Sequence, residues 1–299
     1  MIVVFGSINV DLVARVTRLP QAGETLAGRS FAMLPGGKGA NQALAARRAG
    51  GDVALFGCVG QDEAMSSIAL RTLVRDGVDL TGIHEVDAAP GVALIHVDDR
   101  GENCITVVAG ANAYARATRV PDAMLSAGTT VMMQLELPVD EIAALARRAR
   151  KCGARVILNA APATTLAATL LDDVDVLVVN ELEAKLLAGS ADVDIQAACR
   201  RLAAPSRSVV ATLGPAGALC VHRGAIRTQP APAINVVDTV GAGDAFTAAL
   251  AVALDRGDAF ESAMRQAVAA GSLACGVAGA QDSMPTREAI DRLAATLGG

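Results

Sequence analysis

Residues 174–188 read VDVLVVNELEAKLLA, a short apolar run that leads directly into a helical pattern. The run is rich in β-branched residues and ends at an asparagine, so it predicts a buried strand over 174–179, and the spacing after it predicts a helix over 181–188. Further strands are predicted at 2–5, 53–56, 130–135, 155–158 and 208–212. Further helices are predicted at 39–49, 62–75 and 139–151. This alternation predicts an α/β fold, a mostly parallel central sheet flanked by helices on both faces.

Two stretches depart from the alternation, residues 10–34 and 79–108, which contain extended segments and turn signals but no long helix. We interpret them as a small antiparallel β lid on a single domain that spans residues 1–299. Exposed strands with apolar residues need a cover, which here would be a ligand or a second copy of the chain. From residue 243 onward the sequence is mostly alanine-rich and helical, with no internal repeat or long linker.

The composition argues against several classes of function. The 299 residues include 26 basic and 31 acidic side chains, interspersed, for a net charge of −5, and only one Tyr, five Phe and no Trp. A nucleic-acid partner is therefore not expected, because both a basic stripe and a stacking surface are missing. The six cysteines form no CxxC pair, and the three histidines stand alone, which favours reduced, buried thiols over a zinc site.

The first residues lack the basic start of a signal peptide, and the uncharged stretch 267–280 is shorter than the ~20 residues of a membrane span. We therefore expect no membrane association and a cytoplasmic location.

The strongest local motif is DTVGAGDAF at residues 238–246. Gly241 and Gly243 allow a tight turn and a close approach of a ligand, and the start of the predicted helix over 243–255 offers unpaired N–H groups with partial positive charge. Such a turn suits a phosphate. Asp244 has two interpretations: the pattern alone favours a helix cap, whereas a carboxylate beside an anion site can also accept a proton from a hydroxyl.

Two polar motifs precede it. In PGGKGANQ (35–42), Lys38 and Asn41 follow consecutive glycines, an arrangement that suits either a ligand or a simple turn with a solvated lysine. In GSINVD (6–11), Asn9 and Asp11 follow the first strand and could hold sugar hydroxyls or form an Asx-turn.

Three further features follow predicted strands. In NELE, Asn180 and Glu183 could form a capping box or hold a hydrated Mg²⁺ ion. Glu136 ends another strand, and the turn TLGPAG (212–217) could border a flat ring. We expect all of these motifs at the carboxyl ends of strands, where a sheet of this type builds its ligand site.

In these motifs and their order, the chain resembles the ribokinase-like (PfkB) carbohydrate kinases from its first strand to its last helix. GGKGANQ and GAGD are the two signatures of that family, and GVALIHVDDRGEN, AGAN, MQLELP and GAQDSMP also match it. Two positions depart from the family pattern. Ala160 replaces a proline in the Asn-Pro-Ala-Pro stretch, and Val268 stands where His or Asn is usual near the adenine.

The resemblance implies a role for each motif. Sugar hydroxyls would be held by Asn9, Asp11, Gly37, Lys38, Gly39, Asn41 and Glu136. Asp244 would be the base for the 5-hydroxyl, with an anion hole formed by Gly241, Ala242 and Gly243. The nucleotide would contact Asn180, Gly243 and the loop Thr212, Leu213, Gly214, Pro215, Ala216 and Gly217. Mg²⁺ would be held through water by Glu183, and K⁺ by Asp238, Val240, Ala274, Val277, Gly279 and Ser283, several of them through main-chain oxygens.

The activity that the resemblance implies is ATP-dependent phosphorylation of D-ribose at the 5-hydroxyl, in a homodimer joined through the lid. Two alternatives stay open. One is a kinase of the same family that acts on 2-deoxyribose, a hexose or a nucleoside. The other is a non-catalytic sugar-binding protein on the same scaffold.

Overall fold

The large sheet is the centre of the fold in the computed structural model, which describes residues 1–164 and 166–298. Its strand order is β13-β12-β11-β10-β9-β8-β1-β4-β5. The bounds are β1 Ile2–Phe5, β4 Val53–Gly60, β5 Asp79–Val86, β8 Thr130–Gln134, β9 Arg155–Asn159, β10 Val176–Asn180, β11 Ser208–Thr212, β12 Ala218–His222 and β13 Ala225–Gln229. The strands run parallel from β5 to β11, and the β11–β12 and β12–β13 pairs are antiparallel. The predicted α/β class is confirmed.

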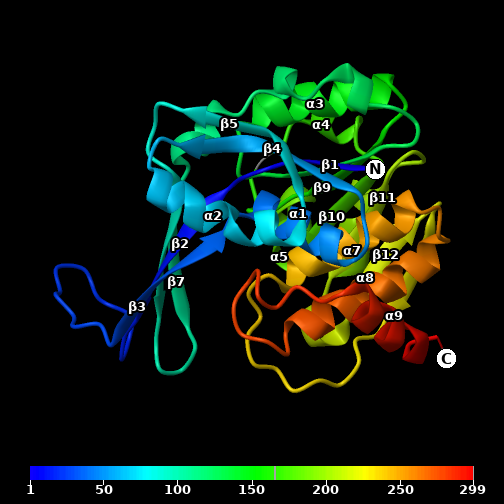
Figure 1. Cartoon of the computed structure of the whole chain (residues 1–299). Coiled ribbons are helices and arrows are strands. Elements are labelled where there is room, and N and C mark those ends of the chain that lie inside the picture. The colour runs from blue at the N-terminus through cyan, green and yellow to red at the C-terminus, as the bar shows by residue number, and fades with distance from the viewer. Residues whose placement is uncertain (165, 299) are drawn as a thin grey trace.

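Helices cover both faces of this sheet (Figure 1). Their bounds are α1 Lys38–Arg48, α2 Glu63–Asp76, α3 Val139–Lys151, α4 Ala168–Leu171, α5 Glu181–Leu187, α6 Ile195–Leu202, α7 Ala242–Asp255, α8 Phe260–Ala274 and α9 Arg287–Thr296. Short 3₁₀ turns are η1 Gly110–Tyr114, η2 Ala117–Arg119, η3 Asp122–Met124 and η4 Gly214–Ala216. Alternate residues of β1 enter different cores: Ile2 and Val4 pack with α1, α7 and α8, whereas Val3 and Phe5 pack with α3 and α6. This alternation is why the strands are apolar on both faces.

The predicted lid is a separate four-stranded sheet in the order β3-β2-β6-β7, which extends to the lower left in Figure 1. Its strands are β2 Asn9–Arg15, β3 Ser30–Gly36, β6 Gly91–Val97 and β7 Asn103–Val108. The two outer pairs are antiparallel, and the central pair β2–β6 is parallel.

The expected lid segment 79–108 starts too early, because residues 79–86 form β5, the edge strand of the large sheet. The alternating polar pattern of β5 belongs to a half-exposed edge, and the sequence alone does not distinguish such an edge from a lid strand.

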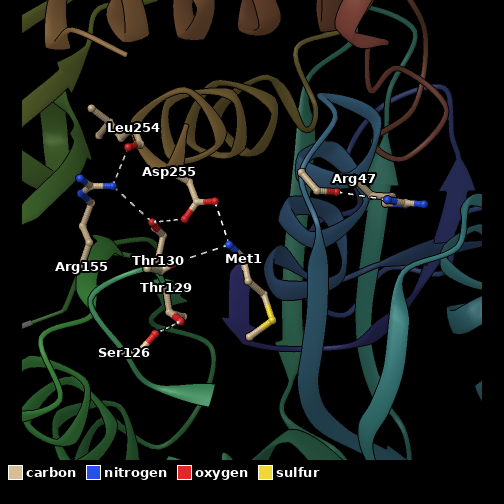
Figure 2. A network of polar contacts seen from close by, with 10 residues as sticks. Met1, Arg47, Ser126, Thr129, Thr130, Arg155, Leu254 and Asp255 are labelled. Atoms are coloured by element: carbon tan, nitrogen blue, oxygen red, sulfur yellow. Dashed lines mark hydrogen bonds and ion pairs between the residues drawn. The ribbon is translucent and has the colours of Figure 1, made fainter. Parts of the chain in front are cut away.

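The far end of α7 is fixed to the starts of three parallel strands, as Figure 2 shows. Asp255 Oδ2 accepts a hydrogen bond from the Met1 amino group (3.0 Å), and Oδ1 accepts one from the Thr130 hydroxyl (2.9 Å). Arg155 donates to the Leu254 carbonyl (2.7 Å). An acid at a helix C-terminus is unfavourable beside the carbonyl dipoles, so these partners offset that cost and fix the axis of α7. The opposite end of the same helix carries Asp244.

Two smaller expectations concern the surface. Among the helices of residues 1–164 and 166–298, none is both long and apolar enough to cross a bilayer. The expectation that the cysteines are buried is wrong for Cys104 and Cys152, which are exposed.

Candidate active site

Asp244 is the third residue of α7, and its side chain does not cap the helix. Gly241, with φ of 79°, is the cap residue, and no side chain accepts a capping bond there. Asp244 Oδ2 instead accepts from Asn41 Nδ2 (3.0 Å), and Oδ1 accepts from Gln42 Nε2 (2.9 Å). The cap interpretation is therefore wrong. A carboxylate that is only 5% exposed is held toward α1 by two side-chain amides.

The start of α7 leaves main-chain donors free next to this carboxylate. Within the described residues, the N–H groups of Gly241, Gly243 and Asp244 have no hydrogen-bond partner, whereas that of Ala242, also expected in the anion hole, donates to the Thr239 carbonyl (3.3 Å). A Cβ placed on Gly243 would meet no atom within 4 Å, so the helix start borders open space. These features suit an anion, as the sequence predicts.

The segment before α7 is not part of a sheet. Residues 234–237 form no strand. The N–H groups of Val237 and Asp238 bond instead to the carbonyl of Cys275 after α8 (2.8 and 3.3 Å). Asp244 therefore does not follow a strand of the sheet, and PGGKGANQ follows the lid strand β3. The expectation that every motif lies at a strand end of the large sheet is wrong for these two.

Hydrogen bonds to Glu136 hold the glycine-rich loop of the PGGKGANQ motif in place. Glu136 Oε2 accepts from the Ser7 hydroxyl (2.5 Å) and from the N–H of Lys38 (3.0 Å), while Ser7 Oγ accepts from the N–H of Gly39 (3.3 Å). A Cβ on Gly39 would lie 2.4 Å from the main chain of Gly6, so a glycine is needed for α1 to approach the end of β1. Gly37, with φ of 90°, makes the turn between β3 and α1. Lys38 is thereby placed beside Asp244.

Asn9 and Asp11 lie two residues apart on β2 and therefore point to the same face of the lid. Asn9 Oδ1 accepts from Asn112 Nδ2 (2.7 Å), and Asn112 in turn bonds to the main chain of Ile8. Asn9 and Glu136 line one cavity of about 400 Å³, into which Asn112 also opens. The sequence gives no role to Asn112. The only signal for it is a buried amide within the AGAN motif.

Asp11 and Asp244 share the electrostatic environment of this region. Burial raises the pKa of Asp11 to about 7, with repulsion by Glu136 and Asp244 adding to it and Lys38 opposing. Burial also raises the pKa of Asp244, against the attraction of Lys38 and the two amide donors.

Lys38 and Glu183 complete the charged set. Burial lowers the pKa of Lys38, but the surrounding carboxylates outweigh it and the net shift is upward. Burial raises the pKa of Glu183, while the Asn180 N–H and Lys38 act against it. One lysine is thus surrounded by carboxylates, an arrangement that suits polar ligands and phosphate charge.

Two adjoining cavities lie on the other side of Asp244. The first, of about 210 Å³, is lined among others by Lys38, Asn180, Glu183, Gly243 and Asp244. The second, of about 550 Å³, is lined by the turn residues Thr212, Gly214, Pro215 and Gly217 and mostly by apolar side chains, including Val268. Leu213 and Ala216 complete this turn, at η4. Gly243 and Thr212 border both cavities, so a long ligand can run from a flat apolar slot to the start of α7.

Asn180 and Glu183 do form the capping box that the sequence allows. Glu183 N–H donates to Asn180 Oδ1 (2.8 Å), and Asn180 N–H donates to Glu183 Oε2 (2.7 Å). The same two residues line the smaller cavity, so the cap also directs the Glu183 carboxylate to the edge of the site. Only one of its oxygens is used by the cap. The other is available to the water shell of a Mg²⁺ ion, and the residues fit such an ion.

Of the candidate K⁺ residues, Asp238 joins two loops by bonding to Val240 and Gly279. Its carboxylate accepts from the N–H of Val240 (3.1 Å) and from the N–H of Gly279 (2.9 Å). Within the described residues, no cluster of three His, Cys, Asp or Glu side chains forms a metal site. A cation here would need main-chain oxygens beside one carboxylate, which is the donor set that Asp238, Val240, Ala274, Val277, Gly279 and Ser283 offer. The residues fit K⁺ in that sense.

A cavity of about 590 Å³ also lies at the opposite ends of the strands, between Arg155, Ser208 and His222. It contains none of the predicted site residues. Several of its acids are already paired, as Glu261 is with Arg227 and Asp258 with Arg256. The carboxyl ends of the strands, with Asp244 between the cavities, are therefore the candidate active site.

Comparison with known proteins supports the same assignment. Residues 1–287 match the pfkB family carbohydrate kinase. A ribokinase from Haemophilus influenzae is 35% identical over 292 residues, 95% of each chain, and a deoxyribokinase from Salmonella typhi is 33% identical over 296 residues, 96% of each. Arabidopsis thaliana ribokinase, solved with ribose and ATP, is 34% identical with a TM-score of 0.88 and 98% of each chain covered. Thermotoga maritima ribokinase has a TM-score of 0.90 at 30% identity, again over 98% of each chain. The chain therefore belongs to the pfkB family of carbohydrate kinases.

Proposed function

We propose that this protein transfers the γ-phosphoryl group of ATP to the 5-hydroxyl of D-ribose. The observation that carries the proposal is the position of Asp244: a buried carboxylate, held by two amides, lies beside free N–H donors and lines the cavity of about 210 Å³. The names of the relatives, and the ribose and ATP in the Arabidopsis structure, support the two substrates.

The transfer needs positioning and charge stabilisation more than covalent chemistry. Asp244 accepts the hydroxyl proton as the sugar oxygen forms a bond to the γ-phosphorus. The bond from that phosphorus to the bridging oxygen breaks, and its electron pair leaves on ADP. The N–H groups of Gly243 and Asp244, with the Lys38 ammonium, receive the migrating negative charge.

Two cations complete the proposal. Mg²⁺ would arrive with ATP and be held through water by Glu183, where it neutralises phosphate charge. K⁺ would occupy the loops around Asp238, next to the anion hole. Turnover should be several-fold faster in K⁺ than in Na⁺ at equal ionic strength, and equal rates would contradict the K⁺ assignment.

Ribose is favoured over other sugars because the pocket is rich in buried polar groups. Asn9, Asp11 and Glu136 each need a hydroxyl partner once the lid excludes water, and a sugar that lacks one leaves a polar group unpaired. The deoxyribokinase relative makes 2-deoxyribose the main competitor.

A coupled ADP-release assay with ribose, 2-deoxyribose, fructose and adenosine tests the activity. We expect the highest kcat/KM for ribose. A higher value for 2-deoxyribose would reassign the substrate, and no ADP release with any of them would favour a sugar-binding protein.

The role of Asp244 is tested by Asp244→Asn. This change keeps the shape and the burial but removes the proton acceptor, so we expect kcat to fall by ~10²–10⁴-fold with sugar binding retained. Calorimetric titration with ribose checks the binding. A variant with near wild-type kcat would remove Asp244 from the reaction.

We also propose that the lid pairs two copies into a homodimer, and that the protein works in the cytoplasm. ATP is available there, and thiols such as the exposed Cys104 stay reduced.

A further inference from the structure

The Asp244 carboxylate is the last acceptor of a buried row of side-chain amides that starts deep in the sheet. Gln134 at the end of β8 donates from Nε2 to Gln42 Oε1 (2.6 Å), and Gln42 donates from Nε2 to Asp244 Oδ1 (2.9 Å). The same Gln42 amide group also donates to Asn159 Oδ1 (3.0 Å). Gln42 and Gln134 are 0% exposed, so water does not replace these contacts.

The Asp244 carboxylate determines which way each amide group of the row is turned. An ionised carboxylate only accepts hydrogen bonds, so Gln42 must turn its NH₂ group toward Asp244 and its oxygen toward Gln134. Gln134 must then donate, and its own Oε1 is left without a hydrogen-bond partner within the described residues. An unpaired buried carbonyl is costly. At one end of the row Asp244 receives its hydrogen bond. At the other end Gln134 Oε1 is the atom left unpaired.

The Gln134 end of the row packs closely against the sheet. A Cβ on Gly6, the residue after β1, would lie 2.3 Å from Gln134 Oε1, so the main chain there leaves that amide no room. Asn159, at the end of β9, donates from Nδ2 to the carbonyl of Val178 in β10 (3.3 Å). Gln42 is therefore supported by residues of β8 and β9, the neighbouring strands of the parallel sheet.

We propose that Gln42 is a positioning residue for the reaction: its amide, supported by Gln134 and Asn159, orients the Asp244 carboxylate and stabilises its charge for proton abstraction. The inference rests on the proposed function and adds to it a residue that would not touch either substrate. Asn41 holds the other oxygen of the same carboxylate but also belongs to the expected sugar set, so its two effects are not separable. Gln42 belongs to no expected substrate set, and its bond to Asp244 is the one that reaches the proposed base.

The other charges near Asp244 stay in place when Gln42 is changed. They are Lys38 on α1, Glu136 after β8 and Asp11 on β2. Lys38 stabilises the charged carboxylate, and the two acids oppose it. A change at Gln42 removes one donor to the ionised form, so the pKa of Asp244 should rise. The loss of activity should then be greatest at low pH.

The main test is Gln42→Met, which keeps the side-chain length and removes the donor. A hydrogen bond to a charged group is worth enough to predict a fall in kcat of ~10-fold and an acid limb of kcat/KM that lies about one pH unit higher. KM for ribose and for ATP should change less than about threefold. An unchanged acid limb with an unchanged kcat would overturn the proposal.

A double-variant cycle separates positioning from a general structural role. In the Asp244→Asn background, Gln42→Met should change the residual kcat by less than about twofold, because the negative charge that Gln42 orients and stabilises is gone. A fall equal to that in the wild-type background would contradict the proposal. The control is Gln266→Met, which removes a glutamine donor to a different aspartate, Asp258 (2.9 Å), and should leave kcat and the acid limb unchanged.

Two further measurements keep the proposal testable. If Gln42→Met does not fold, Gln134→Met removes the supporting bond without touching Asp244 and should shift the acid limb the same way by a smaller amount. If the wild-type chain releases no ADP with any sugar, the proposed function fails. The titration of the Asp244 carboxyl by carbon-13 NMR, assigned from Asp244→Asn, then still decides the inference, because Gln42→Met should raise its midpoint, and an unchanged midpoint would contradict it.

Discussion

Asp11 is proposed to hold a sugar hydroxyl, and its burial lowers the stability of the ligand-free protein when it is ionised. Its pKa of about 7 in the fold lies above the 3.8 of an unperturbed carboxyl, because burial and the nearby Glu136 and Asp244 disfavour its charge. The folded state therefore binds this proton more tightly than the unfolded state. The stability that this proton gives is present below about pH 4 and is lost as the pH rises toward 7.

Asp11→Asn should remove this cost. At pH 8 we expect the variant to be about 2 kcal/mol more stable than the wild type, or about 4 °C higher in Tm, and at pH 4 about equal to it. Thermal unfolding at the two pH values measures the difference. Asp99→Asn, an exposed lid acid paired with Arg29, is the control and should show no such pH dependence. An Asp11→Asn gain of the same size at pH 4 and pH 8 would contradict the charge explanation.

The single residues that sequence analysis missed are those whose partners lie far along the chain. Gln42 contacts Asp244, 202 positions away, and Gln134 contacts Gln42 across 92 positions. Local patterns carry no information on such pairs, which is also why the pattern alone favours the cap over the proton acceptor for Asp244. The one available signal was a polar amide at a position where the strand or helix is otherwise buried. The motifs themselves, such as Lys38 and Glu183, were found because glycines and caps have local signatures.

At the level of elements, the start of α7 is the point where the two nucleotide-side cavities meet, and Gly243 is the residue that keeps it open. A methyl group there meets no protein atom within 4 Å and would enter the space beside the free N–H groups. Alanine is also a better helix residue than glycine. An alanine at position 243 should therefore have opposite effects on the stability of the protein and on its activity.

Gly243→Ala should keep or slightly raise Tm while it lowers kcat/KM for ATP by ~10–100-fold, because small displacements of the phosphoryl group are costly to in-line transfer. Thermal unfolding and steady-state kinetics measure the two effects. Gly128→Ala is the matched control: its Cβ would also be nearly free of contacts, but it lies in a remote turn. Full activity with ATP in Gly243→Ala would argue against phosphate binding at this helix start.

Elements with a strong period were predicted closely, and those defined by their partners were not. The strands at 2–5 and 208–212 match β1 and β11, and the helix at 39–49 matches α1 within one residue. β5 was assigned to the lid because its alternation fits any half-exposed strand, and only its pairing with β4 places it in the large sheet. The β12–β13 hairpin and α6 were not predicted. The hairpin has short apolar runs whose pairing depends on tertiary contacts, whereas α6 has helical spacing and a capping Asp194 that sequence analysis overlooked.

In the whole molecule, two of the residues proposed to hold the sugar lie on a different sheet from the proposed base and nucleotide turn. Asn9 and Asp11 lie on the lid sheet, whereas Asp244 and the nucleotide-side turn at η4 lie on the large sheet and its helices. A sugar bound between them would join the two sheets. The lid must then keep its shape without a helix over its outer end, where β7 is exposed along its full length.

The lid carries apolar residues on both faces, which is unusual for a sheet that faces water. The register puts Leu94 of β6 on one face and Ile105 of β7, opposite Ile95, on the other. Leu94 is 41% exposed and Ile105 is 50% exposed. A second copy of the chain offers the same apolar surface, so a two-fold pair of lids would bury the face that carries Leu94 and Val108 and that points away from Asp11.

The double variant Leu94→Lys, Val108→Lys, with both changes on the face away from Asp11, tests the proposed homodimer. Sedimentation velocity at micromolar concentration should give a dimer for the wild type and a monomer for the variant, because two lysines on each copy would be desolvated and would repel across the interface. Val74→Lys is the control, since Val74 is an apolar residue on α2 that is 64% exposed but lies outside the lid. The monomeric variant should also bind ribose more weakly than the wild type, since its lid would lose the support of the partner. A wild-type chain that sediments as a monomer and is fully active would show that one lid, by itself, is sufficient to cover the sugar.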